Sequence, residues 1–291
     1  MPAHSPEGPA VKNSRPSLLR ALVPLCAPLL FAACSAYGPP HHGEKIYRDL
    51  VYSAPGGRKL HLDLYVPQSP RPAPVVLWVF GGSWRIGNKG YHVNLRDLPQ
   101  HGIALAAIEY RLSGEAKYPA QLDDCQAAAA WLRLHGPEYG LDPRQIAASG
   151  ESAGGHLAAL LGTVEGKSRI QAVCALYPPT DLIAIGREYA NPRQPTSIEE
   201  LLGGPIEQNL ALAAQGSPVH HVSPSSPPFL LFHGAQDSLV PIWHSRELNR
   251  RLHAAGVESK LEIVPGKSHW FLLSKSQVEE TAAFFHRHFH R

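Results

Sequence analysis

A serine in a glycine-rich turn is the strongest sign of chemistry in this chain of 291 residues. Ser152 is the centre of a G-x-S-x-G motif over 150–154, between a strand-like run ending at Ser149 and a helix-like run beginning near Leu157. Glycines two residues to either side let strand and helix approach closely while the hydroxyl stays exposed at a sharp turn. The motif predicts a nucleophilic serine, with an ordinary strand-to-helix turn as the alternative.

Two later loops supply the acid and the base that such a serine needs. Asp237 follows the apolar run Phe229–Gly234, and His269 follows the run Ser259–Val264. The carboxyl ends of parallel strands meet at one edge of a sheet, so we expect both loops to lie beside Ser152. His269 would then take the serine proton, and Asp237 would hold the imidazole in the required tautomer.

Other residues compete for these roles. Asp181 also follows a strand-like run and is the rival acid, although its position favours capping of the following helix. The chain has 17 histidines, most of which we expect at the surface. His286, His288 and His290 could chelate a metal, but residues two apart do not share a helix face. We therefore expect no metal site.

An oxyanion-binding loop is indicated after the apolar strand-like run 74–79. The run ends in Phe-Gly-Gly-Ser-Trp over 80–84, where glycines let backbone amides turn inward. The candidate donors are the amides of Gly82 and Ser83, together with that of Ala153 after the nucleophile. Trp84 and Trp270 are candidate substrate-binding residues, with core packing as the alternative for each, and Glu151 is left without a role.

These motifs, in this order, resemble the α/β-hydrolase superfamily, and in particular small carboxylesterases related to hormone-sensitive lipase and to the bacterial feruloyl-esterase-like (BD-FAE-like) group. The resemblance runs from about Ile46 to the C-terminus. It also rests on segments 109–112, 118–124, 202–205 and 237–241. Family members usually have His-Gly-Gly-Gly at the oxyanion loop, where this chain has Phe80 and Ser83. The resemblance implies a serine esterase that needs no cofactor.

The alternation of strand-like and helix-like segments after residue 74 predicts an α/β fold, with a mostly parallel eight-stranded sheet covered by helices on both faces. Two antiparallel strands would form one edge. Strands are expected near 46–54, 59–66, 74–80, 103–110, 145–150, 170–177, 228–233 and 259–264. Helices are expected near 119–136, 152–163, 242–255 and 275–289, with a weaker one near 92–101.

Residues 181–227 are too many for a bare connection. We expect a small cap with helices near 197–202 and 206–214. Its modest size argues against the broad hinged lid of true lipases. The cap belongs to a catalytic domain expected over 44–291.

The N-terminus resembles an export signal. Basic residues up to Arg20 precede an apolar stretch over 21–33, too short to span a bilayer as a helix. Small residues directly before Cys34 resemble a bacterial lipobox, which implies cleavage there and lipid attachment to Cys34. Cys26 is a weaker candidate because it follows a leucine, and an ordinary signal peptide is the alternative. Residues 34–43 would be a tether.

Localisation follows from that interpretation. We expect an exported bacterial lipoprotein, facing the periplasm or anchored in the outer membrane, whose only contact with the membrane is the lipid. Without residues 1–33 the charges nearly balance, which indicates no nucleic-acid partner. Export permits a disulfide between Cys125 and Cys174, but we expect buried free thiols.

The sequence thus predicts a serine carboxylesterase that hydrolyses small, short-acyl ester substrates through an acyl-enzyme. Two alternatives remain open. One is amide hydrolysis by the same residues, as in a peptidase or arylformamidase, and the other is a non-catalytic binding protein on a hydrolase fold. The natural acyl and alcohol groups and the oligomeric state are left undetermined.

Overall fold

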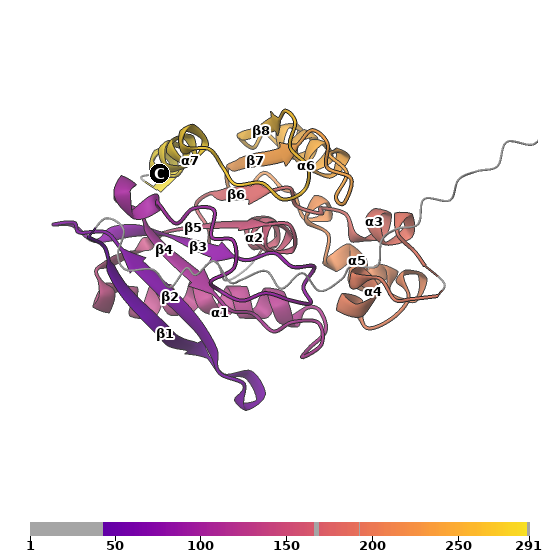
Figure 1. Cartoon of the computed structure of the whole chain (residues 1–291), viewed down its shortest axis with the longest axis horizontal. Helices are drawn as coiled ribbons and strands as arrows, with labels where there is room; N and C mark the ends of the chain where they lie inside the picture. The colour runs from indigo at the N-terminus through magenta and orange to yellow at the C-terminus, as the bar shows by residue number, and fades with distance from the viewer. Residues whose placement is uncertain (1–42, 166–168, 192, 290–291) are drawn as a thin grey trace, which may run out of the picture. The chain divides into compact units, whose positions relative to one another are not determined.

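An eight-stranded sheet in the order β1-β2-β4-β3-β5-β6-β7-β8 forms the centre of the computed structural model, which describes residues 43–165, 169–191 and 193–289 (Figure 1). Strand β2 runs antiparallel to β1 and β4, and every other pair is parallel. The predicted fold class is therefore confirmed. The strands are β1 (Lys45–Ser53), β2 (Leu60–Val66), β3 (Ala73–Val79), β4 (Ala104–Ile108), β5 (Leu141–Glu151), β6 (Val173–Leu176), β7 (Phe229–Gly234) and β8 (Ser259–Val264).

Helices cover both faces of the sheet because successive strand residues point to opposite sides. Val75, Leu77 and Val79 of β3 belong to one core cluster, with residues of α1 (Ala120–His135), α2 (Ala153–Thr163) and α6 (Trp243–Ala254). Val76 and Trp78 belong to a second cluster, with α7 (Lys275–Phe289). The strands are apolar on both faces, as parallel strands in such sheets are.

The expected cap lies between β6 and β7. It contains α3 (Leu182–Glu188), α4 (Ser197–Leu202), a 3₁₀ turn at Ile206–Gln208 and α5 (Leu210–Gln215). The three helices lie beside one another, to the right of the sheet in Figure 1. Helix α4 matches its prediction and begins with a capping box between Thr196 and Glu199. The helix expected over 206–214 is broken at Asn209. The helix expected directly after Asp181 is α3, whose bounds were not predicted.

The weak helix expected near 92–101 is wrong. This segment forms turns and one 3₁₀ turn, Leu98–His101. Leu95 and Leu98 are fully buried in the same cluster as α7, so their apolar spacing reflects packing on the sheet rather than a helical period. Pro99 also lacks the N–H that a longer helix would need.

Two predictions concern cysteines, and the structure tests one of them. Cys125 and Cys174 are buried free thiols, as expected. The signal segment, Cys34 and the tether to residue 42 lie outside the described residues, as does His290. Among the helices that the structure describes, none is both long and apolar enough to cross a membrane.

Candidate active site

Ser152 occupies the strained turn between β5 and α2. Its backbone has φ 50° and ψ −120°, a conformation unfavourable for a residue with a side chain. A Cβ on Gly154 would lie 2.1 Å from the Val79 carbonyl oxygen, and one on Gly150 would lie 2.5 Å from the Gly154 carbonyl. Glycine is therefore required at both positions for steric reasons, which is the reason the sequence suggested.

The structure brings Ser152, His269 and Asp237 into one chain of hydrogen bonds. His269 Nε2 lies 2.8 Å from Ser152 Oγ, and His269 Nδ1 lies 2.7 Å from Asp237 Oδ2. Because the carboxylate can only accept, Nδ1 carries the proton and Nε2 is free to accept from the serine hydroxyl. All three side chains are at least nine-tenths buried. This arrangement can remove a proton from Ser152 and return it to a leaving group.

Asp237 is held as an anion. Its Oδ1 accepts hydrogen bonds from the Leu239 and Val240 amides, at 2.9 and 2.8 Å. Burial alone would raise its pKa, but hydrogen bonds from His233 and His269 outweigh burial and hold the pKa well below its usual range. The group is therefore ionised at neutral pH and can stabilise an imidazolium at His269.

His233 is a second partner of Asp237 that the sequence motifs did not reveal, and it is fully buried in β7. His233 Nε2 lies 2.8 Å from the Val240 carbonyl oxygen and 3.3 Å from Asp237 Oδ2, so it donates, and Nδ1 accepts from Ser245 Oγ at 2.7 Å. A histidine within an otherwise apolar strand, four residues before the acid, is the signal that could have revealed it.

The oxyanion loop has an unusual backbone. Gly82, Ser83 and Trp84 all have positive φ, at 112°, 55° and 58°. Within the described residues the Gly82 and Ser83 amides donate to no protein acceptor. Residue 82 must be glycine for steric reasons, because a Cβ there would lie 2.1 Å from the Ile86 carbonyl oxygen. Ser83 and Ala153 line the pocket beside Ser152, whereas Gly82 does not. Ala153 is the first residue of α2, where helix N–H groups are unpaired.

Phe80 anchors this loop by packing. Its ring stacks on Tyr110 at 4.3 Å, and the Tyr110 hydroxyl donates to the Phe80 carbonyl oxygen at 3.2 Å. A Cβ on Gly87 would lie 2.6 Å from the Phe80 ring. An aromatic side chain thus occupies the place where the family resemblance leads one to expect a histidine.

The two candidate tryptophans have different environments. Trp84 is buried, lines the pocket, and donates from Nε1 to His156 Nδ1 at 3.2 Å. His156 in turn donates from Nε2 to the Gly216 carbonyl oxygen at 2.6 Å, and burial lowers its pKa to about 4. Trp270 is 63% exposed beside His269 and does not line the pocket.

A small pocket of about 110 Å³ opens beside Ser152. Its walls come from the active-site loops and from the cap, which contributes Ile185, Tyr189 and Ser197. Tyr189 also donates from its hydroxyl to the Ser238 carbonyl oxygen at 3.0 Å. A larger pocket of about 670 Å³ lies among cap residues and Lys117, and Ser152 is not part of its wall.

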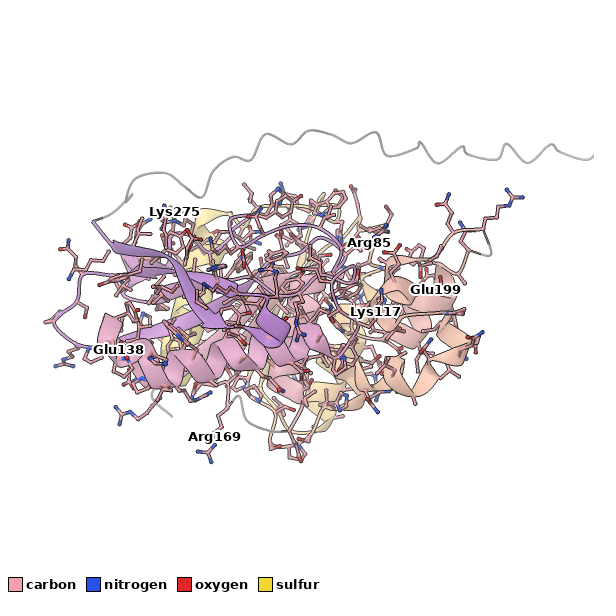
Figure 2. The ribbon with its side chains drawn as sticks, turned by 90° about the horizontal axis from the view of Figure 1, so that it is seen from below. Arg85, Lys117, Glu138, Arg169, Glu199 and Lys275 are labelled. Atoms are coloured by element: carbon pink, nitrogen blue, oxygen red, sulfur yellow. The ribbon has the colours of Figure 1, made fainter. Side chains whose placement is uncertain are left out.

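The cap and the oxyanion loop are joined by an ion pair. Arg85, three residues after Gly82, lies 2.8 Å from a carboxylate oxygen of Glu200 on α4. Figure 2 shows Arg85 and Lys117 on the side of the core next to the cap helix that carries Glu199. Both partners are partly exposed, so we expect a small contribution to stability.

The rival residues lie elsewhere. Asp181 caps α3, where Oδ1 accepts from the Ala184 amide at 2.9 Å, and it is not the acid that contacts His269. His286 Nε2 lies 2.8 Å from the His101 carbonyl oxygen, and His288 lies 3.3 Å from Glu258. Among the residues that the structure describes, no group of three or more histidine, cysteine or acidic side chains is arranged so that it could hold a metal ion.

The model of the BD-FAE family matches residues 62–252, from β2 to the end of α6. The chain belongs to the BD-FAE family. The matched range includes Ser152 and Asp237 and the whole cap, and it ends before His269.

This BD-FAE chain is similar to proteins whose names describe esterases. It is 32% identical to a probable carboxylic ester hydrolase of Mycobacterium tuberculosis, LipM, over 82% of this chain and 61% of that protein. Two solved structures are also similar. A truncated carbohydrate esterase from gut microbiota has 25% identity and a TM-score of 0.75, covering 87% of this chain and 100% of that one. The butyrate-bound esterase Est2 of Thermogutta terrifontis has 26% identity and a TM-score of 0.67, covering 84% and 94%.

The chain spans about 60% of the length of the first curated relatives that it matches. The similarity therefore concerns the hydrolase domain described above.

Proposed function

We propose that this chain is a serine carboxylesterase that hydrolyses small esters with short acyl groups. The observation that carries the proposal is the hydrogen-bonded chain from Ser152 through His269 to Asp237, placed at a pocket next to free backbone amides. Relatives named as esterases and membership of the BD-FAE family support the same reaction class.

The chemistry follows from the geometry. Ser152 Oγ attacks the ester carbonyl while His269 Nε2 takes its proton, and Asp237 stabilises the imidazolium. The oxyanion would be bound by the amides of Ser83 and Ala153, with Gly82 as a further donor. His269 then protonates the leaving alcohol, and water hydrolyses the acyl-enzyme with His269 as base. No step of this sequence requires a cofactor.

The preference for short acyl groups rests on the size of the pocket. Its volume of about 110 Å³ is well below the roughly 300 to 1,000 Å³ of a typical small-molecule site. Ile185 and Tyr189 of the cap close it against longer chains. The butyrate in the Est2 structure is a ligand of this length.

A p-nitrophenyl ester series from acetate to laurate tests the proposal, with Ser152→Ala as the matched variant. We expect kcat/KM to be highest for the shortest esters and to fall by about 10⁴-fold or more in Ser152→Ala. A folded wild type that hydrolyses a matched anilide faster than the ester would overturn the ester assignment. Activity that persists in Ser152→Ala would overturn the assignment of the nucleophile.

A further inference from the structure

Glu151, directly before the nucleophile, is a buried acid that the mechanism above does not use. Its side chain is 1% exposed at the end of β5. Its Oε2 accepts hydrogen bonds from Tyr177 Oη at 2.7 Å and from Asn94 Nδ2 at 2.9 Å. A buried carboxyl is unfavourable unless its hydrogen-bonding capacity is used, so these two donors account for its presence.

Both donors lead to the loop that carries His269. The Tyr177 ring contacts the His269 ring edge-on, with 4.8 Å between the ring centroids. Its centroid lies 5.0 Å from that of the Phe271 ring. Asn94 accepts through Oδ1 from the Leu273 amide at 2.9 Å. Glu151 therefore holds two side chains that fix the His269 loop at two points, on either side of Phe271.

The aliphatic part of the Glu151 side chain also lies against the oxyanion loop. A Cβ on Gly81 would lie 3.3 Å from Glu151 Cγ and 3.3 Å from Ser152 Cβ. The side chain is thus bordered by three separate segments, those of Gly81, Asn94 and Tyr177.

We propose that Glu151 is a positioning residue for the proposed hydrolysis, which fixes the His269 ring at hydrogen-bonding distance from Ser152 through Tyr177 and Asn94. The inference rests on the proposed function, since it concerns the same pair of reacting groups. A displacement of His269 by about 1 Å is enough to lower the rate about 10²-fold.

The charge of Glu151 matters because an ionised acceptor forms stronger hydrogen bonds than a neutral one. The titratable groups that face it are His92, whose Nδ1 lies 3.8 Å from Oε1, together with Tyr177 and Tyr110. Burial raises the pKa of Glu151 to about 7, against the hydrogen bonds from Tyr177 and Asn94. Ionisation of Glu151 near neutrality should therefore strengthen the positioning as pH rises.

Tyr177→Phe tests the network, with Ser149→Ala as the control. Both changes remove one buried hydroxyl. Ser149 lies on the same strand as Glu151, and its hydroxyl donates to the Cys174 carbonyl oxygen of β6 and not to a residue of the network. In acetate ester hydrolysis we expect kcat to fall about 10-fold or more in Tyr177→Phe, with KM changed less than about twofold. Ser149→Ala should keep kcat within about twofold of wild type, at a similar loss of melting temperature.

Glu151→Gln and Glu151→Ala give the readout that a purely structural role would not change. Gln keeps the shape and one acceptor, so it should retain more of kcat than Ala. Because ionisation of Glu151 strengthens the hydrogen bonds that it accepts, log(kcat/KM) of wild type should rise more steeply between about pH 5 and 7 than that of Glu151→Gln, whose side chain does not titrate.

The outcomes separate the inference from the proposed function. Equal effects of Tyr177→Phe and Ser149→Ala, or an unchanged slope in Glu151→Gln, would overturn the inference while leaving the esterase in place. A folded wild type with no ester hydrolysis, measured beside Ser152→Ala, would overturn the proposed function itself and the inference that depends on it.

Discussion

Both oxygens of Asp237 face donors only. Two backbone amides point at Oδ1, and the two imidazole groups of His233 and His269 lie at Oδ2. An amide at this position would have to direct its NH₂ group at a donor in either orientation. The environment therefore requires a carboxylate and not merely a side chain of this shape.

Asp237→Asn should accordingly fix His269 in the wrong tautomer, with Nε2 protonated and unable to accept from Ser152. We expect kcat to fall about 10⁴-fold, the size seen when this type of acid is replaced by its amide in serine hydrolases. The far-ultraviolet circular dichroism spectrum should stay unchanged. A loss of less than about tenfold would show that Asp237 does not set the tautomer.

At the scale of elements, the tightest constraint is the packing of α2 against β3 at the elbow. A Cβ on Gly154 would approach two backbone carbonyl oxygens, those of Val79 and Phe80, at 2.1 and 2.5 Å. Backbone atoms at the centre of a sheet cannot move aside as the end of a flexible side chain can. The distance between α2 and β3, and with it the position of Ser152 at the turn, depends on this contact.

Gly154→Ala should destabilise the fold by about 3 kcal/mol or more, or prevent folding. Gly114→Ala is the matched control, because no atom lies within 4 Å of the added methyl and its φ is not positive. Its free energy of unfolding should stay within about 0.5 kcal/mol of wild type. Urea denaturation measures both, and equal stability of the two variants would contradict the steric argument.

The elements with a clear sequence pattern were predictable, and those without one were not. The strands that follow residue 74 are short apolar runs bounded by turns, so their positions agreed closely with the structure. The segment 92–101 imitated a helix because Leu95 and Leu98 bury on the sheet. In the cap, α3 has only seven residues. Asp181 caps its first turn, and the sequence predicted this capping role but not the bounds of the helix.

The site shows the same division. Ser152, Asp237 and His269 could be named because each follows a strand at the same edge of the sheet. Their supporting residues could not, because His233, Tyr177 and Asn94 act through contacts between segments far apart in sequence. No local pattern records that Asn94 bonds the amide of Leu273, 179 residues later.

For the whole molecule, buried titratable groups determine how stability depends on pH. Burial lowers the pKa of His156 to about 4 and that of His244 to about 3. Each must gain a proton on unfolding below its ordinary pKa, so its stabilisation is complete above about pH 6.5 and is lost as pH falls. Glu151 acts in the opposite sense, since its raised pKa favours the folded state at low pH and this contribution is lost as pH rises through about 7.

Near pH 5 the two histidines and Glu151 therefore leave a net uptake of about one proton on unfolding, so the free energy of unfolding should rise there by about 1.4 kcal/mol per pH unit, and less steeply toward pH 6.5. Glu151→Gln should roughly double this slope. Urea titrations at several pH values measure it. A slope that does not respond to Glu151→Gln would contradict the assignment of a raised pKa to this group.

Export as a lipoprotein is a proposal about the chain as a whole, since Cys34 precedes the described residues. Expression of the full chain in a bacterial host should place the wild type in the membrane fraction with a lipid-modified N-terminus at residue 34, detectable by mass spectrometry. Cys34→Ser should shift the protein to a soluble or unprocessed form, because the acyl chains supply the anchoring free energy. An equal distribution of both would refute lipidation at Cys34.

The cap enters the chain as one continuous insertion between β6 and β7, while Ser152, Asp237 and His269 all lie outside it. The part of the pocket wall that the cap contributes is therefore encoded apart from the three residues of the proton relay. Natural selection can exchange Ile185, Tyr189 or Ser197 to admit a different ester without disturbing the relay beneath. Substrate specificity can therefore change through substitutions in one short segment of the sequence. Directed evolution confined to residues 181–227 is the corresponding route to new specificities.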